Sequence, residues 1–357
     1  VMESDPAGVQ EFASLPDHPG AWNGRQYSDE SKYIYQLSSL ELQELSDALL
    51  KFKALGLDGD LVCPTNFPLP TLHRKLASLR LDIHRGKGFA LIRGLNPSEY
   101  SSTDLTTLYL GIQSYIANVR GRQDEKGNML VHIVANNASE FTRQHTRHST
   151  SEISFHNEEA GDVISWLTRN AAVSGGECII ASAYAVYNTL ASDHQDLIRV
   201  LTQSDWVFDS RDNGSRPVLF FQDDGIIINF GRIPLIGNEI HPRPAHLPQI
   251  TGQQLEALDA IENVARKAEL VIKTRPGEIH FINNLFILHR RNAFENNAQS
   301  SECRHLVRMR LRDDSLCYEL PSQLEKQWSH YFNEALEKVW HIDPMPDGFF
   351  PLRFYAN

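Results

Sequence analysis

The chain has 357 residues, of which 41% are hydrophobic, and a chain of this size and composition can bury a full core. Its formal net charge of −11 disfavours a polyanionic partner, and Lys and Arg form no block interleaved with aromatic residues, so nucleic acid is not the expected ligand. No apolar run of about 18 residues suits a membrane span, and the first residues lack the pattern of a secretory signal. These features favour a protein that acts on a small molecule.

Cysteine usage points to the cellular compartment. The four cysteines are Cys63, Cys178, Cys303 and Cys317, and no two of them have C-x-x-C spacing. A chain of this length does not need disulfides to be stable, so we expect free thiols in a reducing compartment, the cytoplasm.

The first part of the chain is expected to be helical. Ser38 and Glu41 can form a capping box in front of an apolar stripe. Apolar residues from Leu72 to Ile83 also recur at helical spacing, whereas the apolar run within residues 88–94 lies between glycines and is typical of a buried strand. Residues 1–87 are therefore predicted to form a helical decoration packed on the core.

Short strands dominate from about Ile153 onward. The expected strands cover 162–170, 218–221, 226–230, 269–274, 278–283, 285–289 and 305–311. Residues 223–225 predict a hairpin, residues 275–277 predict a second turn, and the spacing of apolar residues over 255–264 predicts a helix. This pattern is typical of an α+β fold with a double-stranded β-helix (a jelly roll, cupin-like) as the catalytic core, spanning residues 88–320 and decorated by helices.

The end of the chain, residues 321–357, is predicted to contain a helix and an aromatic tail. Ser322 and Glu325 are expected to cap a helix whose apolar stripe runs to Val339. The tail is unusually aromatic, and we expect it to dock on the body, where Leu352 and Phe354 could line the substrate pocket. All three parts are expected to make one domain.

Three residues have the chemistry of a metal site. Residues two apart in a strand face the same side, so His156 and Glu158 are expected to point into one cavity. His289 ends an apolar segment and is expected at the rim of the core. Two histidines and one carboxylate suit iron(II) and leave positions open for a bidentate 2-oxo acid and for O2.

A strand near the end of the core carries four arginines at even positions, Arg304, Arg308, Arg310 and Arg312. A 2-oxoglutarate molecule bound to the metal through its keto-acid end leaves a second carboxylate inside the core, where an uncompensated anion is costly. Arginine offers a planar fork that keeps its charge. We expect one or two of the four to turn inward, with Arg308 as the first choice for this contact and Arg304 as the second.

These segments, in this order, resemble the taurine dioxygenase and clavaminate synthase superfamily of Fe(II)/2-oxoglutarate-dependent oxygenases. The glycine-flanked run of residues 88–94 resembles the N-terminal strand of that family, and residues 174–178 and 276–278 resemble two further family segments. The resemblance covers roughly Gly88 to Arg312. It implies Fe(II), 2-oxoglutarate and O2 as the reagents for oxidation of a small molecule, by hydroxylation, desaturation or cyclisation. Many relatives form dimers, so a homodimer is possible by analogy.

Carried over to this chain, the resemblance implies His156, Glu158 and His289 as iron ligands and Arg308, with Arg304 beside it, as the contacts of 2-oxoglutarate. The acidic ligand is Glu158 where much of the family has Asp, and the branch that uses Glu favours amino acids or amino-acid-derived secondary metabolites. A position that is often Thr and contacts 2-oxoglutarate is Cys178 here, and a thiol is a poor hydrogen-bond partner.

Other interpretations remain open from the sequence alone. His145 and His148 have a spacing that suits a helical ligand pair, but they lie in a polar stretch with no carboxylate motif. The jelly roll could be a non-catalytic metal- or ligand-binding cupin-like module, although such a module has no need for a buried arginine. A zinc-dependent hydrolase could use Glu159 as its base, but no HExxH arrangement is present.

Overall fold

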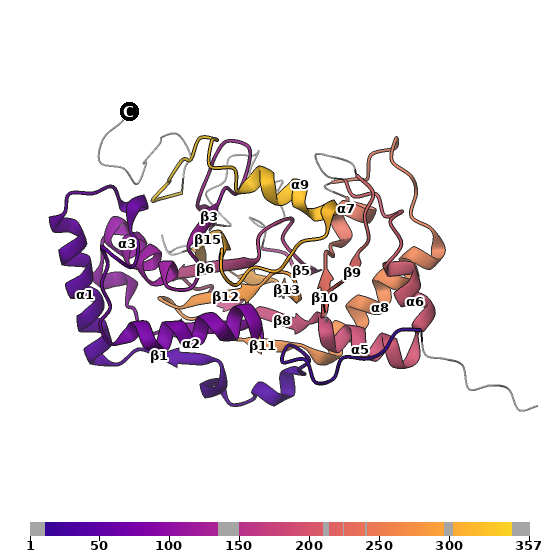
Figure 1. Ribbon diagram of the computed structural model, residues 1–357, viewed down its shortest axis with the longest axis horizontal. Helices are drawn as coiled ribbons and strands as arrows, with labels where there is room; N and C mark the ends of the chain where they lie inside the picture. Colours follow the sequence, from indigo (N-terminus) through magenta and orange to yellow (C-terminus); the bar gives the residue numbers. More distant parts are fainter. Residues whose placement is uncertain are drawn as a thin grey trace, which may run out of the picture.

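The structure is a computed structural model that describes residues 11–134, 150–209, 214–223, 225–239, 241–295 and 303–344. Two β-sheets lie at its centre, and helices gather at either end of them (Figure 1).

The larger sheet has the strand order β1-β2-β12-β6-β15-β3, and β4 also pairs with β15. Its strands are β1 (Ile34–Gln36), β2 (Phe89–Arg93), β3 (Val119–Gly121), β4 (Val131–Val134), β6 (Val163–Asn170), β12 (Ile279–Asn283) and β15 (His305–Arg312). Apart from the parallel pair of β1 and β2, these strands are antiparallel.

The smaller sheet has the order β11-β8-β13-β5 and is antiparallel. It consists of β5 (Ile153–His156), β8 (Cys178–Ser182), β11 (Leu270–Ile272) and β13 (Ile287–Arg291). Two short antiparallel pairs accompany the sheets: β9 (Leu219–Gln222) with β10 (Gly225–Ile228), and β7 (Ser174–Gly175) with β14 (Phe294–Glu295). The double antiparallel sheet confirms the expected α+β jelly-roll core.

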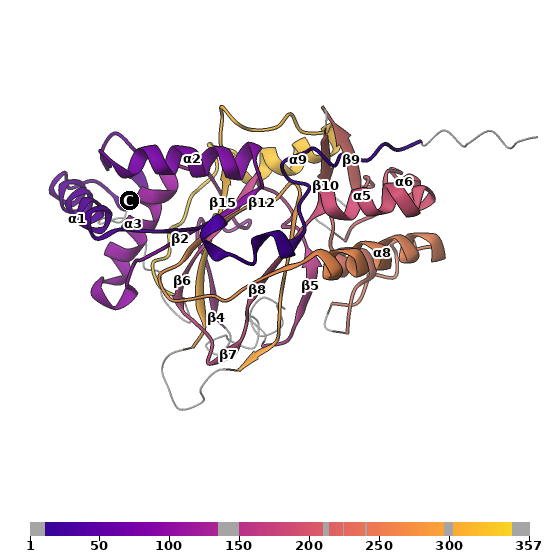
Figure 2. The same ribbon diagram turned by 90° about the horizontal axis from the view of Figure 1, so that it is seen from below.

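The helices form two groups at opposite ends of the sheets (Figure 2). The first group is α1 (Ser39–Ala54), α2 (Leu72–Arg85) and α3 (Ser102–Ser114), and the second is α5 (Ala183–Asp193), α6 (Gln195–Leu201) and α8 (Gly252–Ala268). Within the described residues, two further helices are α7 (Arg232–Ile236) and α9 (Ser322–Tyr331), and four 3-10 turns cover Gly24–Tyr27, Glu30–Lys32, Gly59–Leu61 and Pro97–Glu99.

The larger sheet separates two apolar clusters. Successive residues of a strand face opposite sides, and β15 shows this directly: Leu306 packs between the sheets, whereas Val307 packs against α1, α2 and α3. The cluster between the sheets also includes Phe155 of β5 and Ile180 of β8, and it extends to α5, α6 and α8. The N-terminal helices therefore close one face of the larger sheet, and the other face looks into the space between the sheets.

Several predicted elements are confirmed with their local causes. The side chain of Ser38 accepts from the backbone N–H of Glu41, and the side chain of Glu41 accepts from the N–H of Ser38, so the capping box starts α1 as expected. The hairpin at 223–225 is present as β9 and β10. The turn at 275–277 links strands of different sheets, because β11 pairs with β8 while β12 pairs with β2 and β6.

The prediction for the last helix was wrong in two respects. Helix α9 ends at Tyr331 instead of reaching Val339, and Pro321 occupies its N-cap without a side-chain hydrogen bond, so Ser322 does not cap it. The Oδ1 atom of Asn333 accepts from the N–H of Ala335 at 3.0 Å, and such a local turn competes with helix continuation. Leu352 and Phe354, the expected pocket residues of the tail, lie outside the described residues.

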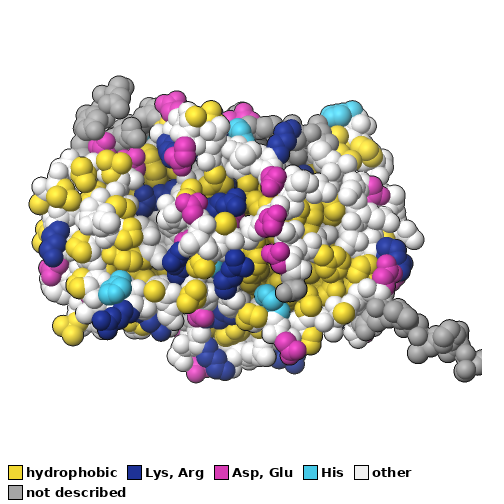
Figure 3. All heavy atoms as spheres, in the orientation of Figure 1, with side chains coloured by type: hydrophobic (Ala, Val, Ile, Leu, Met, Phe, Trp, Pro, Cys, Tyr) yellow, Lys and Arg dark blue, Asp and Glu magenta, His cyan; other side chains and the backbone are white. Residues whose placement is uncertain are grey.

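Within the described ranges, no helix has the length and apolar character needed to cross a bilayer. On the face drawn in Figure 3, basic side chains are interspersed with acidic ones.

Candidate metal centre

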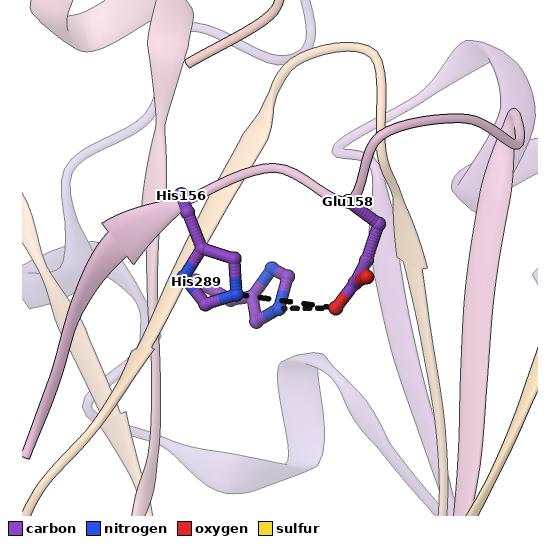
Figure 4. Close-up of side chains that lie close together, drawn as sticks. All are labelled: His156, Glu158 and His289. Carbon is purple, nitrogen blue, oxygen red and sulfur yellow. Dashed lines mark ion pairs between the residues drawn. The ribbon is translucent and has the colours of Figure 1, made fainter. Parts of the chain in front are cut away.

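The structure brings the three predicted ligands together. His156, Glu158 and His289 each offer one ligand atom, and these atoms lie within 4.8 Å of one another. The Oε1 atom of Glu158 is 3.9 Å from Nε2 of His156 and 3.7 Å from Nε2 of His289 (Figure 4). Within the described residues this is the one group of three or more His, Cys, Asp or Glu side chains that could share an ion.

Sheet register places the two histidines side by side. His156 ends β5 and is the direct partner of His289 in β13, so their rings lie 4.2 Å apart between centroids. Glu158 follows after the end of β5, so strand alternation is not the reason that it faces His156. The three predicted residues do converge, but the carboxylate is brought in by the turn after the strand (Figure 4).

Two asparagines fix that turn. The side chain of Asn284 accepts from the N–H of Glu158 at 2.9 Å and donates to the carbonyl groups of Glu158 and Gly161, both at 3.0 Å. The side-chain amide of Asn157 donates to the carbonyl groups of Asn284 and Ile287. These contacts hold the backbone of the acidic ligand against the segment that leads into β13.

The protonation of His156 suits a metal ligand. Its Nδ1 atom lies 2.9 Å from the carbonyl oxygen of Ser154, which can only accept, so Nδ1 carries the proton and the lone pair of Nε2 faces Glu158. Burial, followed by the nearby His289, lowers the pKa of His156 to about 4. The imidazole is therefore neutral at physiological pH, as metal binding requires.

Glu158 is ionised. Burial opposes its charge, but Arg308, which is ion-paired with Oε1 of Glu158, followed by the hydrogen bond with His289, outweighs burial and holds the pKa of Glu158 well below its usual range. Two imidazole nitrogens and one carboxylate form a donor set that fits a divalent iron ion.

A first cavity, which we call the arginine cavity, opens beside the three ligands. Its volume is about 620 Å³, and besides the ligands it is lined by Ile164, Trp166, Cys178, Arg291, Arg304 and Arg308, among others. Arg304 and Arg308, the two arginines expected here, thus both face it. Arg310 is buried as well, but its guanidinium stacks over the ring of Tyr331 at 4.0 Å.

One end of the arginine cavity concentrates positive charge. The guanidinium groups of Arg291 and Arg304 both lie over the ring of Phe294, at 4.8 and 5.1 Å from its centroid. Burial and the charge of Arg304 lower the pKa of Arg291 to about 9, and burial lowers the pKa of Arg304 to about 10. Two buried cations this close favour an anion between or beside them.

A second cavity, which we call the hairpin cavity, adjoins two of the three ligands, His156 and Glu158. Its volume is about 1310 Å³, and its walls also include Phe208, Arg216, Asn229, Phe230, Glu159 and Gly231. Arg308 lines both cavities, so the metal centre lies where the two meet.

Sequence reasoning missed three of these contributors. Arg291 is two residues after His289 in the same strand, and this spacing was a signal that it shares the face of the ligand. Asn284 and Arg216 have no comparable signal, because their contacts join segments far apart in the chain. The rival pair His145 and His148 lies outside the described residues.

Three other core histidines contact protein groups away from the three ligands. Nδ1 of His132 lies 2.9 Å from Nε2 of His305, and Nε2 of His132 donates to the carbonyl of His341 at 2.7 Å. His280 stacks on Trp166 with ring centroids 4.9 Å apart.

Sequence comparison identifies a family and a relative of this chain. The family model described as "Taurine catabolism dioxygenase TauD, TfdA family" matches residues 51–310. Taurine hydroxylase-like protein SAT17 from Stachybotrys chartarum is 34% identical over 340 residues, which cover 91% of this chain and 88% of that protein.

Solved structures share the fold. Asparagine oxygenase in complex with Fe(II), hydroxyasparagine and succinate matches with a TM-score of 0.60 and 16% identity, over 78% of this chain and 93% of that one. The non-haem iron oxygenase OrfP in complex with Fe and alpha-ketoglutaric acid matches with a TM-score of 0.58 and 15% identity, over 79% and 94%.

Proposed function

Because this chain belongs to the TauD/TfdA family of Fe(II)/2-oxoglutarate-dependent dioxygenases, we propose that it oxidises a C–H bond of an amino acid or an amino-acid-derived small molecule at the centre formed by His156, Glu158 and His289. The family match decides against a zinc hydrolase and against a non-catalytic cupin-like module. The observation that carries the proposal is the convergence of the three ligand atoms within 4.8 Å at the junction of two cavities.

His156, Glu158 and His289 would hold the iron. The bound iron supplies the activation of O2 that couples conversion of 2-oxoglutarate to succinate and CO2 with oxidation of the substrate. The protein contributes a neutral His156 whose Nδ1 proton is held by Ser154, and a carboxylate that is kept ionised by Arg308. Both cavities reach this centre, because His156 and Glu158 line each of them.

The arginine cavity is the proposed site of 2-oxoglutarate. Arg304 and Arg291 offer two guanidinium groups at its charged end, which suits the distal carboxylate of the co-substrate. Arg308 is ion-paired with Glu158, so we propose that its main role is to orient the acidic ligand and that Arg304 takes the distal carboxylate. This reverses the order of preference that the sequence suggested for these two residues. Cys178 lines the cavity and would contribute packing more than a hydrogen bond.

The hairpin cavity is the proposed substrate site. Two observations support an amino acid or a derivative: the acidic ligand is Glu158, as in the amino-acid-oxidising branch that the sequence resembles, and the structural neighbours include enzymes described with hydroxyasparagine and hydroxyarginine. The hairpin cavity, at about 1310 Å³ against about 620 Å³ for the arginine cavity, is the larger of the two spaces beside the metal centre.

Succinate formation tests the proposal. The iron-loaded enzyme should be incubated with 2-oxoglutarate and O2 against the common L-amino acids and their N-acyl derivatives, with succinate and oxidised product both measured. We expect at least one compound to raise succinate formation and to yield a product heavier by one oxygen or lighter by two hydrogens. If iron and 2-oxoglutarate bind but no amino acid or derivative is oxidised, the proposed substrate class is wrong.

A further inference from the structure

Helix α9 packs one face against the turn that carries Glu158. Gln327, Trp328 and Tyr331 are buried residues of this helix, and their spacing puts them on one side of it. The hydroxyl of Tyr331 donates to Oε2 of Glu159 at 2.7 Å. The side-chain amide of Gln327, oriented to satisfy its neighbours, donates to the carbonyl of Glu159 at 3.2 Å. Two positions of α9 therefore hold the residue that follows the acidic ligand.

A third and fully buried contact joins Trp328 to Asp162. The indole N–H of Trp328 donates to Oδ1 of Asp162 at 2.6 Å, and the two residues are 3% and 1% exposed. Among the described residues, Oδ2 of Asp162 has no hydrogen bond and lies 3.9 Å from Nε of Arg312. A buried carboxylate is costly without its hydrogen-bond donor, so this contact fixes Asp162 in relation to α9.

Asp162 is also connected to the acidic ligand. Its N–H donates to the carbonyl of Leu311 in β15 at 3.1 Å, and its carbonyl accepts from the N–H of Asn284 at 2.8 Å. The side chain of Asn284 in turn accepts from the N–H of Glu158 and donates to its carbonyl. A displacement of Asp162 is therefore passed to Glu158 through a single residue.

The turn between these residues is tightly enclosed. Gly161 has a φ of +106°, and a Cβ atom at this position would lie 2.5 Å from Cγ of Arg310. The guanidinium of Arg310 lies over the ring of Tyr331, at 4.0 Å from its centroid. Residues 158–162 are thus held between β15 on one side and α9 on the other, and the position of α9 affects the backbone of Glu158.

We propose that Trp328 is a positioning residue of the metal centre, which acts through Asp162 and Asn284 to hold Glu158 in place for iron. The inference rests on the proposed function, because it takes Glu158 as an iron ligand. Trp328 lines neither of the two cavities, so its effect on the centre is indirect. Helix α9 follows residue 310, where the family match ends, so this support comes from beyond the matched part of the chain.

Removal of the indole N–H tests this role. Trp328→Phe keeps an aromatic ring but leaves the buried carboxylate of Asp162 without its donor. We expect Fe(II) binding to weaken by roughly 3- to 10-fold, which is less than the loss of a direct partner of a ligand would cost. Binding is measured anaerobically by competition with a chelator. With saturating iron, the KM for 2-oxoglutarate should keep its wild-type value, because no residue of α9 lines the arginine cavity.

Trp340→Phe is the matched control. Trp340 is also 3% exposed, but its indole N–H has no hydrogen-bond partner among the described residues, and its ring packs in the cluster on the other face of the larger sheet. This variant should bind iron with wild-type affinity. Wild-type iron affinity in Trp328→Phe, or an equal weakening in both variants, would overturn the inference.

Substitutions of Asp162 test the other half of the contact. Asp162→Asn keeps an oxygen that can accept from Trp328, so its iron affinity should stay close to wild type, whereas Asp162→Ala should resemble Trp328→Phe. The double variant Trp328→Phe with Asp162→Ala should bind iron no more weakly than either single variant, because both changes remove the same contact. Additive losses would contradict the inference. If Asp162→Ala does not fold, Trp328→Phe and Asp162→Asn still decide.

The wild-type protein separates this inference from the proposed function. If it fails to bind Fe(II) and to form a visible absorption band with 2-oxoglutarate, the proposed function is wrong, and the inference falls with it. If the wild-type protein does both and Trp328→Phe binds iron equally well, only the positioning role of Trp328 is wrong.

Discussion

The two cavities that meet at the metal centre are built in different ways. The arginine cavity takes its walls mainly from strands of both sheets, and its side chains are positioned by register: His289 pairs with His156, and Arg291 follows on the same face. The hairpin cavity takes its walls from the segments around β9, β10 and α7, with support from α9. If the proposed assignment of the two cavities is correct, co-substrate binding relies on the sheets, and substrate selection relies on connecting segments that can vary without disturbing the sheets.

If iron binds where the two cavities meet, removal of one of its three proposed ligands should weaken Fe(II) binding more than any other substitution proposed here. His289→Ala should weaken Fe(II) binding by more than about 100-fold, since loss of a residue that merely supports a ligand already costs 10- to 100-fold. Binding is measured anaerobically by competition with a chelator. His73→Ala, on the exposed side of α2, is the control and should bind iron normally. Equal affinity in the two variants would contradict the assignment.

Replacement of Arg304 tests whether the arginine cavity binds 2-oxoglutarate. Arg304→Gln should raise the KM for 2-oxoglutarate by roughly 10- to 100-fold, because the distal carboxylate loses a charged hydrogen-bond partner, and it should leave the affinity for iron unchanged. Arg290→Gln is the matched control, because Arg290 also lines the arginine cavity but pairs with Glu269 at 2.8 Å.

Replacement of Arg308 tests whether this residue supports the metal ligand Glu158 instead of binding 2-oxoglutarate. Arg308→Gln should weaken iron binding first, because Arg308 is ion-paired with the ligand Glu158. An unchanged iron affinity together with a large rise in the KM for 2-oxoglutarate would return Arg308 to the role that the sequence suggested.

Asn284 links the turn that carries Glu158 to the segment before β13, so its loss should weaken iron binding less than the loss of a ligand. Asn284→Ala leaves the N–H of Glu158 and the carbonyl of Gly161 without these partners, and we expect about 10-fold weaker iron binding and a loss of about 1–3 kcal/mol in the free energy of unfolding. Iron affinity is measured well below the melting temperature of the variant. A stability loss with unchanged iron affinity would make Asn284 a purely structural residue.

The smallest effect is expected at Cys178. Cys178→Ala removes a thiol from the arginine cavity, and because a thiol is a weak hydrogen-bond partner, the KM for 2-oxoglutarate should change by less than about 3-fold. Steady-state kinetics at saturating substrate measure this directly. A rise similar to that of Arg304→Gln would show that Cys178 contacts the co-substrate.

The sequence predicted those features that depend on residue type and on short local patterns. The convergence of His156, Glu158 and His289 could be predicted because these three residues stand in family order, although His289 lies in the middle of β13 and strand alternation was not the reason that Glu158 converges on His156. Helix α1 and the β9–β10 hairpin followed from a capping box and a turn signal. In each case the information lies within a few neighbouring residues.

Long-range contacts account for what the sequence did not reveal. Helix α9 was predicted too long because Asn333 forms a local turn that apolar spacing cannot show. Arg216 lines the hairpin cavity, where Asn229, Phe208 and Gln327 meet around it in the fold. The preference for Arg308 over Arg304 could not be judged before the ion pair with Glu158 was visible.

Anaerobic addition of Fe(II) and then 2-oxoglutarate to the metal-free protein, followed by visible absorbance, tests the central claim most directly. A chelated iron(II)–oxo acid complex absorbs weakly in the visible, so we predict a new band in the wild-type protein that is absent in His289→Ala and needs more 2-oxoglutarate to form in Arg304→Gln. Iron binding without any such band would contradict the account, because the centre would then not chelate the co-substrate.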